Sequence, residues 1–321
     1  MNLSREVVDY DKMVEFVVNS LISVGVAEDH AKVTAELLIE ADLKGHYSHG
    51  VARLPFYIHD ITNSLTEKHG LPSILKHKGG TAWVDGNNLL GAVVGKFCME
   101  KAIELAQIHG LGMVTVKHSN HFGICSYYSE MASAAGLIGM AFTNTSPCAF
   151  HCNASERAIG SNPISFAAPA KGSDKFSLDM ATTTVAYGKI EVVQRKGIDV
   201  IPHSWGANEN GQESKSATEV LDKGGLMPLG GKMETGGYKG TGLAMMVEIL
   251  CGVISGASFG KNIRQWQNDV TGSADLGQCF LVIDPECFAP CFSDRLQEYI
   301  NETRNLETMS DTPIMVAGKF L

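Results

Sequence analysis

The spacing of apolar residues predicts that the first third of the chain is helical. Between residues 28 and 43, apolar side chains recur at intervals of three and four: Ala31, Ala35, Leu38 and Ala41. Gly45 follows as a helix stop. The segments 8–24 and 53–61 carry a similar pattern, so we expect three helices in this part of the chain.

From residue 82 onward, strand and helix patterns alternate. Strands are predicted at 82–87, 111–117, 137–144, 164–169, 176–179 and 279–283, and helices at 92–109, 124–135, 182–195, 242–254 and 294–305. Residues 198–237 are rich in Gly, Ser, Asn and Lys and have little periodicity, which indicates a long surface excursion. The alternation is typical of an α/β protein. Because helices cluster at both ends of the chain, we expect the two ends to pack together as one lobe.

The composition narrows the class of protein. The 321 residues exceed the usual size of one domain, so two or three lobes are expected. Hydrophobic residues make up 44% and charged residues 19%, which is typical of a globular protein. The net charge of -9, without a basic stripe, argues against a nucleic-acid binder, and no apolar run approaches the ~18 residues that a membrane span needs. Residues 1–6 carry an acidic residue early and no apolar stretch, so we expect no signal peptide.

The cysteines and glycine motifs exclude several kinds of site. Eight cysteines at irregular spacing indicate reduced thiols in a cytoplasmic protein. Cys148, His151 and Cys152 do not make a complete zinc set, so no metal is expected. Residues 240–245 begin like a dinucleotide fingerprint but lack its third glycine, so a standard Rossmann loop is not supported.

The first candidate chemistry lies in residues 45–53 (GHYSHGVAR), which follow a helix stop. If the next helix starts at Ser48, His49 and Arg53 lie on one face of it. Such a pair suits a substrate with a carboxylate next to a carbonyl. Arginine binds the carboxylate through two hydrogen bonds, while histidine donates a proton to the carbonyl oxygen. The alternative is a capped loop with a surface arginine.

The second candidate lies in residues 117–123 (KHSNHFG), between an apolar strand and a helix. Ligands of open α/β folds usually bind at such an edge, so His121 is a candidate for catalysis. A loop histidine is more often a satisfied hydrogen-bonding group, and either His118 or His121 is open to a structural role.

Two further segments are candidate anion sites. Residues 178–184 (LDMATTT) predict the end of a strand that runs into a helix. The amides and hydroxyls at the N-terminus of that helix could bind an anion. The alternative is an ordinary N-cap. Residues 236–240 (GGYKG) predict a glycine loop whose Lys239 clamps a phosphate, or only a turn.

Taken in order, six segments resemble the type-2 malate/L-lactate dehydrogenase family, which also includes ureidoglycolate, sulfolactate and 2,3-diketogulonate oxidoreductases. They are GHYSHGVARLP (45–55), HSNHFG (118–123), TNTSP (143–147), IGSNPISFAAPA (159–170), LDMATTTVAYGKIE (178–191) and GGYKGTGLAMMVEILCGVISGASFG (236–260). The resemblance implies an α/β fold that is not Rossmann. A helical lobe from both chain ends (1–75 with 270–321) would accompany a cofactor- and substrate-binding lobe (76–269) on a largely antiparallel sheet. It also implies a homodimer.

The resemblance further implies residue roles. His49 and His121 are both acid/base candidates, and which of them carries the proton stays open. Arg53 matches the carboxylate-binding arginine, with Ser48 beside it in the pocket. Positions that would hold the dinucleotide are Thr145, Asp179, Ala181, Thr182, Thr183 and Lys239, with Asn162 and Pro163 in the adjacent loop.

The expected activity is reversible hydride transfer between NAD, or NADP, and a 2-oxoacid, with a histidine exchanging the proton. The resemblance implies malate and oxaloacetate as the first pair. Lactate, ureidoglycolate and sulfolactate are alternatives within the class. A different class is a non-catalytic dimeric relative, because family members usually continue beyond the segment matched here by residues 316–319, which contributes to their cofactor site.

Overall fold

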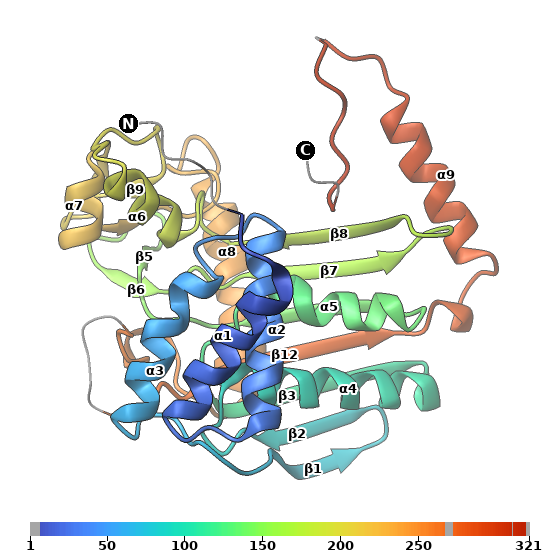
Figure 1. The fold of residues 1–321 in the computed structure, drawn as a ribbon. Coiled ribbons are helices and arrows are strands. Elements are labelled where there is room, and N and C mark those ends of the chain that lie inside the picture. The colour runs from blue at the N-terminus through green and yellow to red at the C-terminus, as the bar shows by residue number, and fades with distance from the viewer. Residues whose placement is uncertain (1–6, 267–271, 310, 319–321) are drawn as a thin grey trace.

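The centre of the fold is a seven-stranded β-sheet (Figure 1). In this computed structural model, which describes residues 7–266, 272–309 and 311–318, the strand order is β1-β2-β3-β12-β4-β7-β8. The strands are β1 (Ser73–Lys78), β2 (Thr81–Asp85), β3 (Leu111–Ser119), β4 (Ile138–Thr143), β7 (Ile164–Pro169), β8 (Lys175–Met180) and β12 (Leu276–Ile283). Neighbouring strands are antiparallel except for β2 and β3. The expected α/β fold on a largely antiparallel sheet is confirmed. Residues 1–6 and Lys319, on which two expectations rested, lie outside the described residues.

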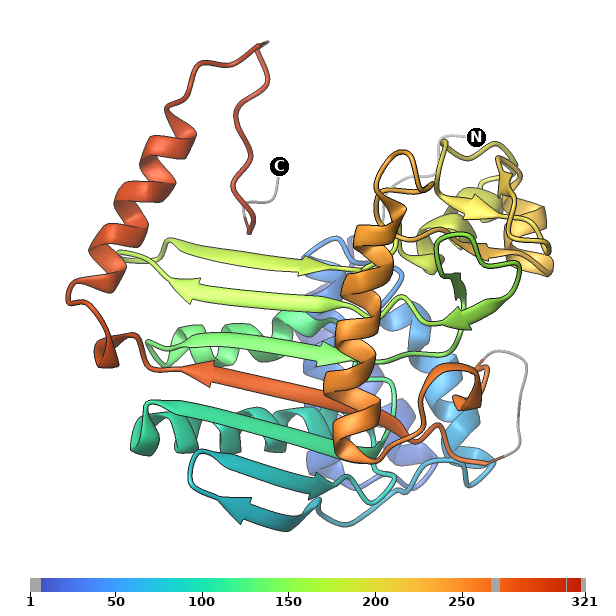
Figure 2. The same cartoon turned by 180° about the vertical axis from the view of Figure 1, so that it is seen from behind.

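Helices cover both faces of this sheet. The α-helices of the described residues are α1 (Tyr10–Ser23), α2 (Glu28–Leu43), α3 (Leu54–Thr62), α4 (Gly91–His109), α5 (Cys125–Ala134), α6 (Tyr187–Arg195), α7 (Ala217–Asp222), α8 (Gly237–Glu248) and α9 (Phe292–Arg304). Helices α4 and α5 lie on one face, with α1–α3 in front of them (Figure 1), and α8 crosses the opposite face (Figure 2). Gly112 permits the close approach of β3 and α4, because a Cβ there would lie 1.9 Å from the carbonyl oxygen of Ala102. Within the described residues, no helix has the length and apolar character needed to cross a membrane.

The three N-terminal helices form where the apolar pattern predicted them. Helix α2 has the predicted bounds, and Val17, Leu38 and Ile61 from the three helices meet in one buried cluster. The turn after α2 is fixed by Asp42, whose carboxylate accepts the backbone N–H of Val51 at 2.9 Å. This turn holds the first candidate segment, residues 45–53, between α2 and α3.

The last strand and helix lie apart from these N-terminal helices. Strand β12 lies between β3 and β4, where Phe280 pairs with Val114 on one side and Ala141 on the other. Helix α9 lies beyond the β8 edge (Figure 1), and its Ile300 is buried in a small cluster there. The structure therefore differs from the expected packing of the two chain ends, because α9 does not lie against α1–α3. An amphipathic pattern shows that α9 has an apolar face, but it does not show which surface covers that face. The division of the chain at residues 75 and 270 stays a prediction.

The expectation of a surface excursion over residues 198–237 was wrong. This stretch contains α7 and three short strands, which join two others in a five-stranded sheet of order β10-β9-β11-β5-β6. These strands are β5 (Ala149–Phe150), β6 (Arg157–Ile159), β9 (Gly206–Ala207), β10 (Glu213–Ser214) and β11 (Gly225–Leu226). Ile201, Val220 and Leu226 belong to the buried cluster of this small unit. Strands of two residues are too short to produce a periodic pattern, so they could not be predicted from the spacing of apolar residues.

Candidate active site

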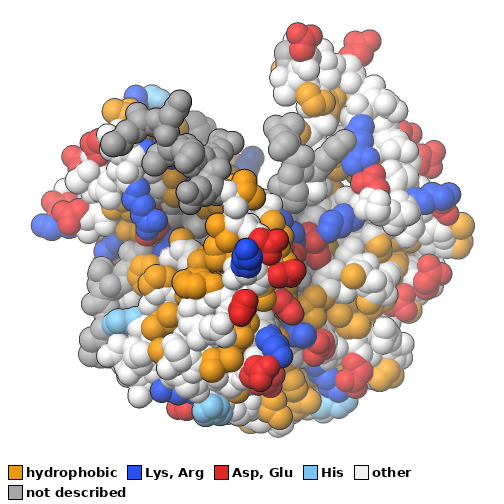
Figure 3. Space-filling view, viewed as in Figure 1, with side chains coloured by type: hydrophobic (Ala, Val, Ile, Leu, Met, Phe, Trp, Pro, Cys, Tyr) orange, Lys and Arg blue, Asp and Glu red, His pale blue; other side chains and the backbone are white. Residues whose placement is uncertain are grey.

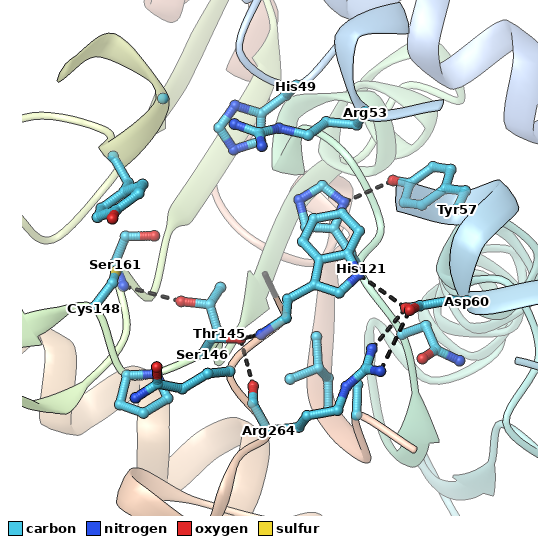
Figure 4. A pocket seen from close by; sticks show the side chains of 18 of the residues that line it. His49, Arg53, Tyr57, Asp60, His121, Thr145, Ser146, Cys148, Ser161 and Arg264 are labelled. Carbon is cyan, nitrogen blue, oxygen red and sulfur yellow. Dashed lines mark hydrogen bonds and ion pairs between the residues drawn. The ribbon is translucent and has the colours of Figure 1, made fainter. Parts of the chain in front are cut away.

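A cavity of about 160 Å³ lies where the N-terminal helices, the main sheet and the small unit meet (Figure 4). Its walls come from α3 and the turn before it, the loop after β3, residues 145–148 and the start of α6. The cavity therefore collects segments that are far apart in the sequence.

The structure brings His49 and Arg53 together in this cavity, as their spacing predicted. The predicted reason was wrong, because the chain forms a short 3-10 turn at Val51–Arg53 and α3 begins only at Leu54. The hydroxyl of Ser48 does not cap a helix but lies 2.8 Å from Nδ1 of His49.

Arg53 is held rigidly, with 7% of its surface exposed. Its Nε donates to the backbone oxygen of Ser48 at 2.5 Å, and Nη2 donates to Glu191 in α6 at 2.7 Å. Gly188 makes this contact between α6 and the turn possible, because a Cβ there would lie 2.4 Å from the Cβ of Ser48 and 2.9 Å from Nη2 of Arg53. A guanidinium held in this way is ready to bind an anion without reorganising.

His121 lies in the same cavity, after the end of β3. Its Nδ1 lies 2.6 Å from the hydroxyl of Tyr57 and accepts the backbone N–H of Gly123 at 3.3 Å. The ring stacks on Trp266 with centroids 4.5 Å apart and faces His49 at 5.7 Å. Since a backbone N–H can only donate, the neutral ring of His121 carries its proton on Nε2.

Burial controls the protonation of both histidines. Together with the smaller effect of the positive charge of Arg53, it lowers the pKa of His49 to about 4. It also lowers the pKa of His121 well below the ordinary value, with smaller contributions from His49 and Arg53. Both imidazoles are therefore neutral near pH 7. Burial raises the pKa of Tyr57, so its hydroxyl keeps its proton.

His118 takes the structural role that the sequence left open. It does not line the cavity, and its Nδ1 lies 3.0 Å from the carboxylate of Asp85. Its backbone N–H donates to Asp275.

A buried ion pair forms another wall, and sequence reasoning missed it. The guanidinium of Arg264 bonds both carboxylate oxygens of Asp60, at 3.3 and 2.6 Å, and Nε1 of Trp266 donates to Asp60 at 2.8 Å. Asp60 lies on the helix predicted at 53–61, whereas Arg264 and Trp266 follow in a stretch without a motif. No local signal connects residues this far apart along the chain.

Among the predicted cofactor residues, only Thr145 lines the cavity. Its backbone N–H donates to the side chain of Asn162 and its hydroxyl accepts from the backbone of Ser161. Asn162 is itself fully buried and donates to Glu248 at 2.6 Å. Pro163 lies next to it, outside the cavity lining.

The remaining predicted cofactor residues lie outside the cavity lining. Thr182 and Thr183 do not stand at a helix N-terminus, because α6 begins at Tyr187; their buried hydroxyls donate to the backbone oxygens of Ser161 and Val185. Asp179 accepts the backbone N–H of Ser126 at the start of α5. Ala181 is half-buried, and Lys239 is exposed in the first turn of α8.

Cys148 lines the cavity as a neutral thiol, because burial raises its pKa to about 11. Within the described ranges, no group of three or more His, Cys, Asp or Glu residues is arranged to hold a metal ion. All eight cysteines are free.

Comparisons with known proteins show which family this chain resembles. Residues 8–320 match the model of the malate/L-lactate dehydrogenase family. A malate dehydrogenase of Pyrococcus abyssi is 42% identical over 298 residues, which cover 92% of this chain and 81% of that protein. An L-sulfolactate dehydrogenase of Methanocaldococcus jannaschii is 37% identical, covering 95% and 86%. The crystal structure of malate dehydrogenase from Entamoeba histolytica superposes with a TM-score of 0.93 at 32% identity, covering 98% of this chain and 89% of that one.

The chain is therefore an oxidoreductase that acts on the CH–OH group of a hydroxyacid. More particularly, it belongs to the malate/L-lactate dehydrogenase family, whose chemistry requires a nicotinamide cofactor.

Proposed function

We propose that the chain is a 2-hydroxyacid dehydrogenase that uses NAD, with NADP as the alternative cofactor, and that malate and oxaloacetate are its first substrate pair. The observation that carries this proposal is the meeting of a buried guanidinium, Arg53, with two neutral imidazoles, His49 and His121, in one small cavity. The similarity to proteins named malate dehydrogenase supports the choice of substrate.

Arg53 binds the carboxylate next to the reacting carbon. Its planar group can form two parallel hydrogen bonds to a carboxylate, and its attachment to Ser48 and Glu191 fixes the direction of those bonds. A fixed carboxylate places the neighbouring carbonyl or hydroxyl oxygen beside the two imidazoles.

The hydrogen bonds distinguish the roles of the two histidines. Nδ1 of His121 faces the N–H of Gly123, a donor that cannot become an acceptor, so His121 keeps its proton on Nε2 and stabilises the developing oxyanion as a hydrogen-bond donor. Nδ1 of His49 faces the hydroxyl of Ser48, which can either donate or accept. His49 can therefore gain and lose a proton at Nε2, and we assign it as the acid/base group.

The cofactor end of the cavity is the wall formed by Thr145, Ser146 and Ser161, flanked by Pro147 and Tyr187. Hydroxyls and backbone groups of this wall suit a carboxamide, and the apolar rings suit the faces of a nicotinamide. The nicotinamide, when bound, gives or accepts the hydride. Thr182, Thr183 and Asn162 support this wall from behind through Ser161, Val185 and Thr145.

We also propose that the chain is a cytoplasmic homodimer. The outer side of α8 and its π-helical continuation (Ile249–Val253) exposes Met245, Ile249 and Val253 by about half of their surface, and in Figure 2 none of the described helices and strands lies over it. Further apolar side chains are exposed on α1, where Phe16 is 57% exposed, and hydrophobic atoms gather over this region in Figure 3. Surfaces of this kind mark protein–protein contacts. Sedimentation of wild type and Ile249→Asp tests this part, and a wild-type monomer would overturn it.

The decisive experiment for the activity measures NADH and NADPH absorbance with oxaloacetate, pyruvate and other 2-oxoacids. Oxaloacetate with NADH should give the highest kcat/KM. If another acid gives the highest value, the substrate assignment is wrong, and if no acid is reduced with either cofactor, the proposed activity is wrong.

A further inference from the structure

One cavity-lining cation has no role in the scheme above. Arg157 stands at the start of β6 and is half-buried in the cavity wall. The other two arginines of the cavity, Arg53 and Arg264, are paired with Glu191 and Asp60. Within the described part of the chain, the guanidinium of Arg157 forms no hydrogen bond or ion pair.

The aliphatic part of the Arg157 side chain is held in place, although its guanidinium is unpaired. Its Cδ and Cγ cover Gly225 of β11 so closely that a Cβ there would lie 2.8 and 3.0 Å from them. Its charge acts on two cavity residues, Cys148 and Tyr187. Burial raises their pKa to about 11 and about 12, and the positive charge of Arg157 opposes part of each rise. The guanidinium is therefore held near this end of the cavity by the small unit.

No nitrogen of Arg157 is both buried and without a partner, so the guanidinium stays accessible and can bind an anionic ligand in the cavity. The N-cap and first two residues of α6, residues 186–188, line the same cavity, and the N-terminus of a helix also favours a negative charge. Neither Cys148 nor Tyr187 supplies that charge, because both are neutral near pH 7.

We propose that Arg157 binds a second anionic group of the substrate, a carboxylate or sulfonate at the end of the chain away from the carboxylate that Arg53 holds. This inference rests on the proposed function, because it assigns the preferred substrates of that site. It makes Arg157 the residue that selects dianionic 2-oxoacids over monocarboxylic acids of the same length.

The test compares Arg157→Gln with wild type on two four-carbon acids, oxaloacetate and 2-oxobutyrate. Loss of a charged hydrogen bond should lower kcat/KM for oxaloacetate by about 10–100-fold. The value for 2-oxobutyrate should change less than about threefold, and KM for NADH should not change. Arg195→Gln, on the exposed last turn of α6, is the matched control and should behave as wild type. Equal losses on both acids, or a change confined to KM for NADH, would overturn the proposal.

A binding measurement separates this inference from the proposed activity, because it needs no turnover. Malate should raise the Tm of wild type more than 2-hydroxybutyrate does, and Arg157→Gln should abolish the difference. If wild type reduces no 2-oxoacid but malate still protects through Arg157, the activity is wrong and the anion site stands. If malate protects wild type and Arg157→Gln equally, or protects neither, the anion site is wrong.

Discussion

The hydroxyl of Tyr57 lies 2.6 Å from Nδ1 of His121, although the two residues are 64 positions apart in the sequence. Tyr57 projects from α3 and His121 from the loop after β3, so this bond joins the N-terminal helices to the main sheet at the cavity (Figure 4). With the N–H of Gly123 on the same nitrogen, it fixes the orientation and the tautomer of the imidazole.

Removal of that hydroxyl should lower turnover without abolishing it. Tyr57→Phe keeps the ring but loses one hydrogen bond, so we expect kcat to fall by about 3–10-fold, with KM for oxaloacetate nearly unchanged. Steady-state kinetics with Tyr127→Phe as the control measures this, because Tyr127 lies outside the cavity lining. A rise in KM alone would show that Tyr57 serves substrate binding instead.

The two histidines should respond differently to glutamine. A proton carrier contributes roughly 10²–10⁴-fold to the rate, and glutamine cannot replace it, so His49→Gln and His49→Ala should lose kcat to the same extent. Glutamine can still donate a hydrogen bond, so His121→Gln should retain about tenfold more activity than His121→Ala. NADH binding, followed by fluorescence, should persist in all four variants. If the pattern is reversed, His121 carries the proton.

Arg53→Lys keeps the positive charge but loses the planar guanidinium that can form two parallel hydrogen bonds to the substrate carboxylate. We expect KM for oxaloacetate to rise by about 10–100-fold, while NADH affinity stays nearly constant. Arg195→Lys provides the control on an exposed part of α6. Equal losses of substrate and cofactor affinity would mean that Arg53 is structural.

The buried imidazoles should make stability depend on pH. Histidines in an unfolded chain titrate near 6.5, whereas the pKa of His49 in the folded chain is about 4. Between these values the unfolded chain binds more protons, so the free energy of unfolding should decrease as pH falls from 6.5 to 4. From this difference in pKa, His49 alone makes the free energy of unfolding about 3 kcal/mol lower below the window than above it. Urea unfolding of wild type and His49→Gln at pH 7, 6 and 5 measures this, and identical pH slopes would contradict it.

Breaking the buried pair behind Trp266 should destabilise the fold. Asp60→Ala leaves Arg264 without its bidentate partner, and such a loss costs about 3–5 kcal/mol of unfolding free energy. Asp294→Ala removes the exposed partner of Lys171 and should cost less than about 1 kcal/mol. Denaturant unfolding of both variants gives the comparison, and similar losses would show that the Asp60 pair is not desolvated.

The sequence by itself determined the main elements and part of the site. Helical spacing located α2 with its observed bounds, because an apolar face repeats every three to four residues whatever covers it. The local motifs around His49 and His121 were also sufficient to name both residues, since each lies in a short polar segment between ordered elements. Thr145 was named through the resemblance, and it lines the same cavity.

Only the tertiary structure decided which distant residues meet. The pairing of Asp60 with Arg264, the unpaired head of Arg157 and the position of β12 inside the sheet depend on contacts across most of the chain. Thr182 and Thr183 show the same limit, because their hydroxyls suggested a helix N-terminus until the buried bonds to Ser161 and Val185 were known. A sequence pattern reports which face of an element is apolar, but burial and pairing are set by the neighbours that the fold supplies.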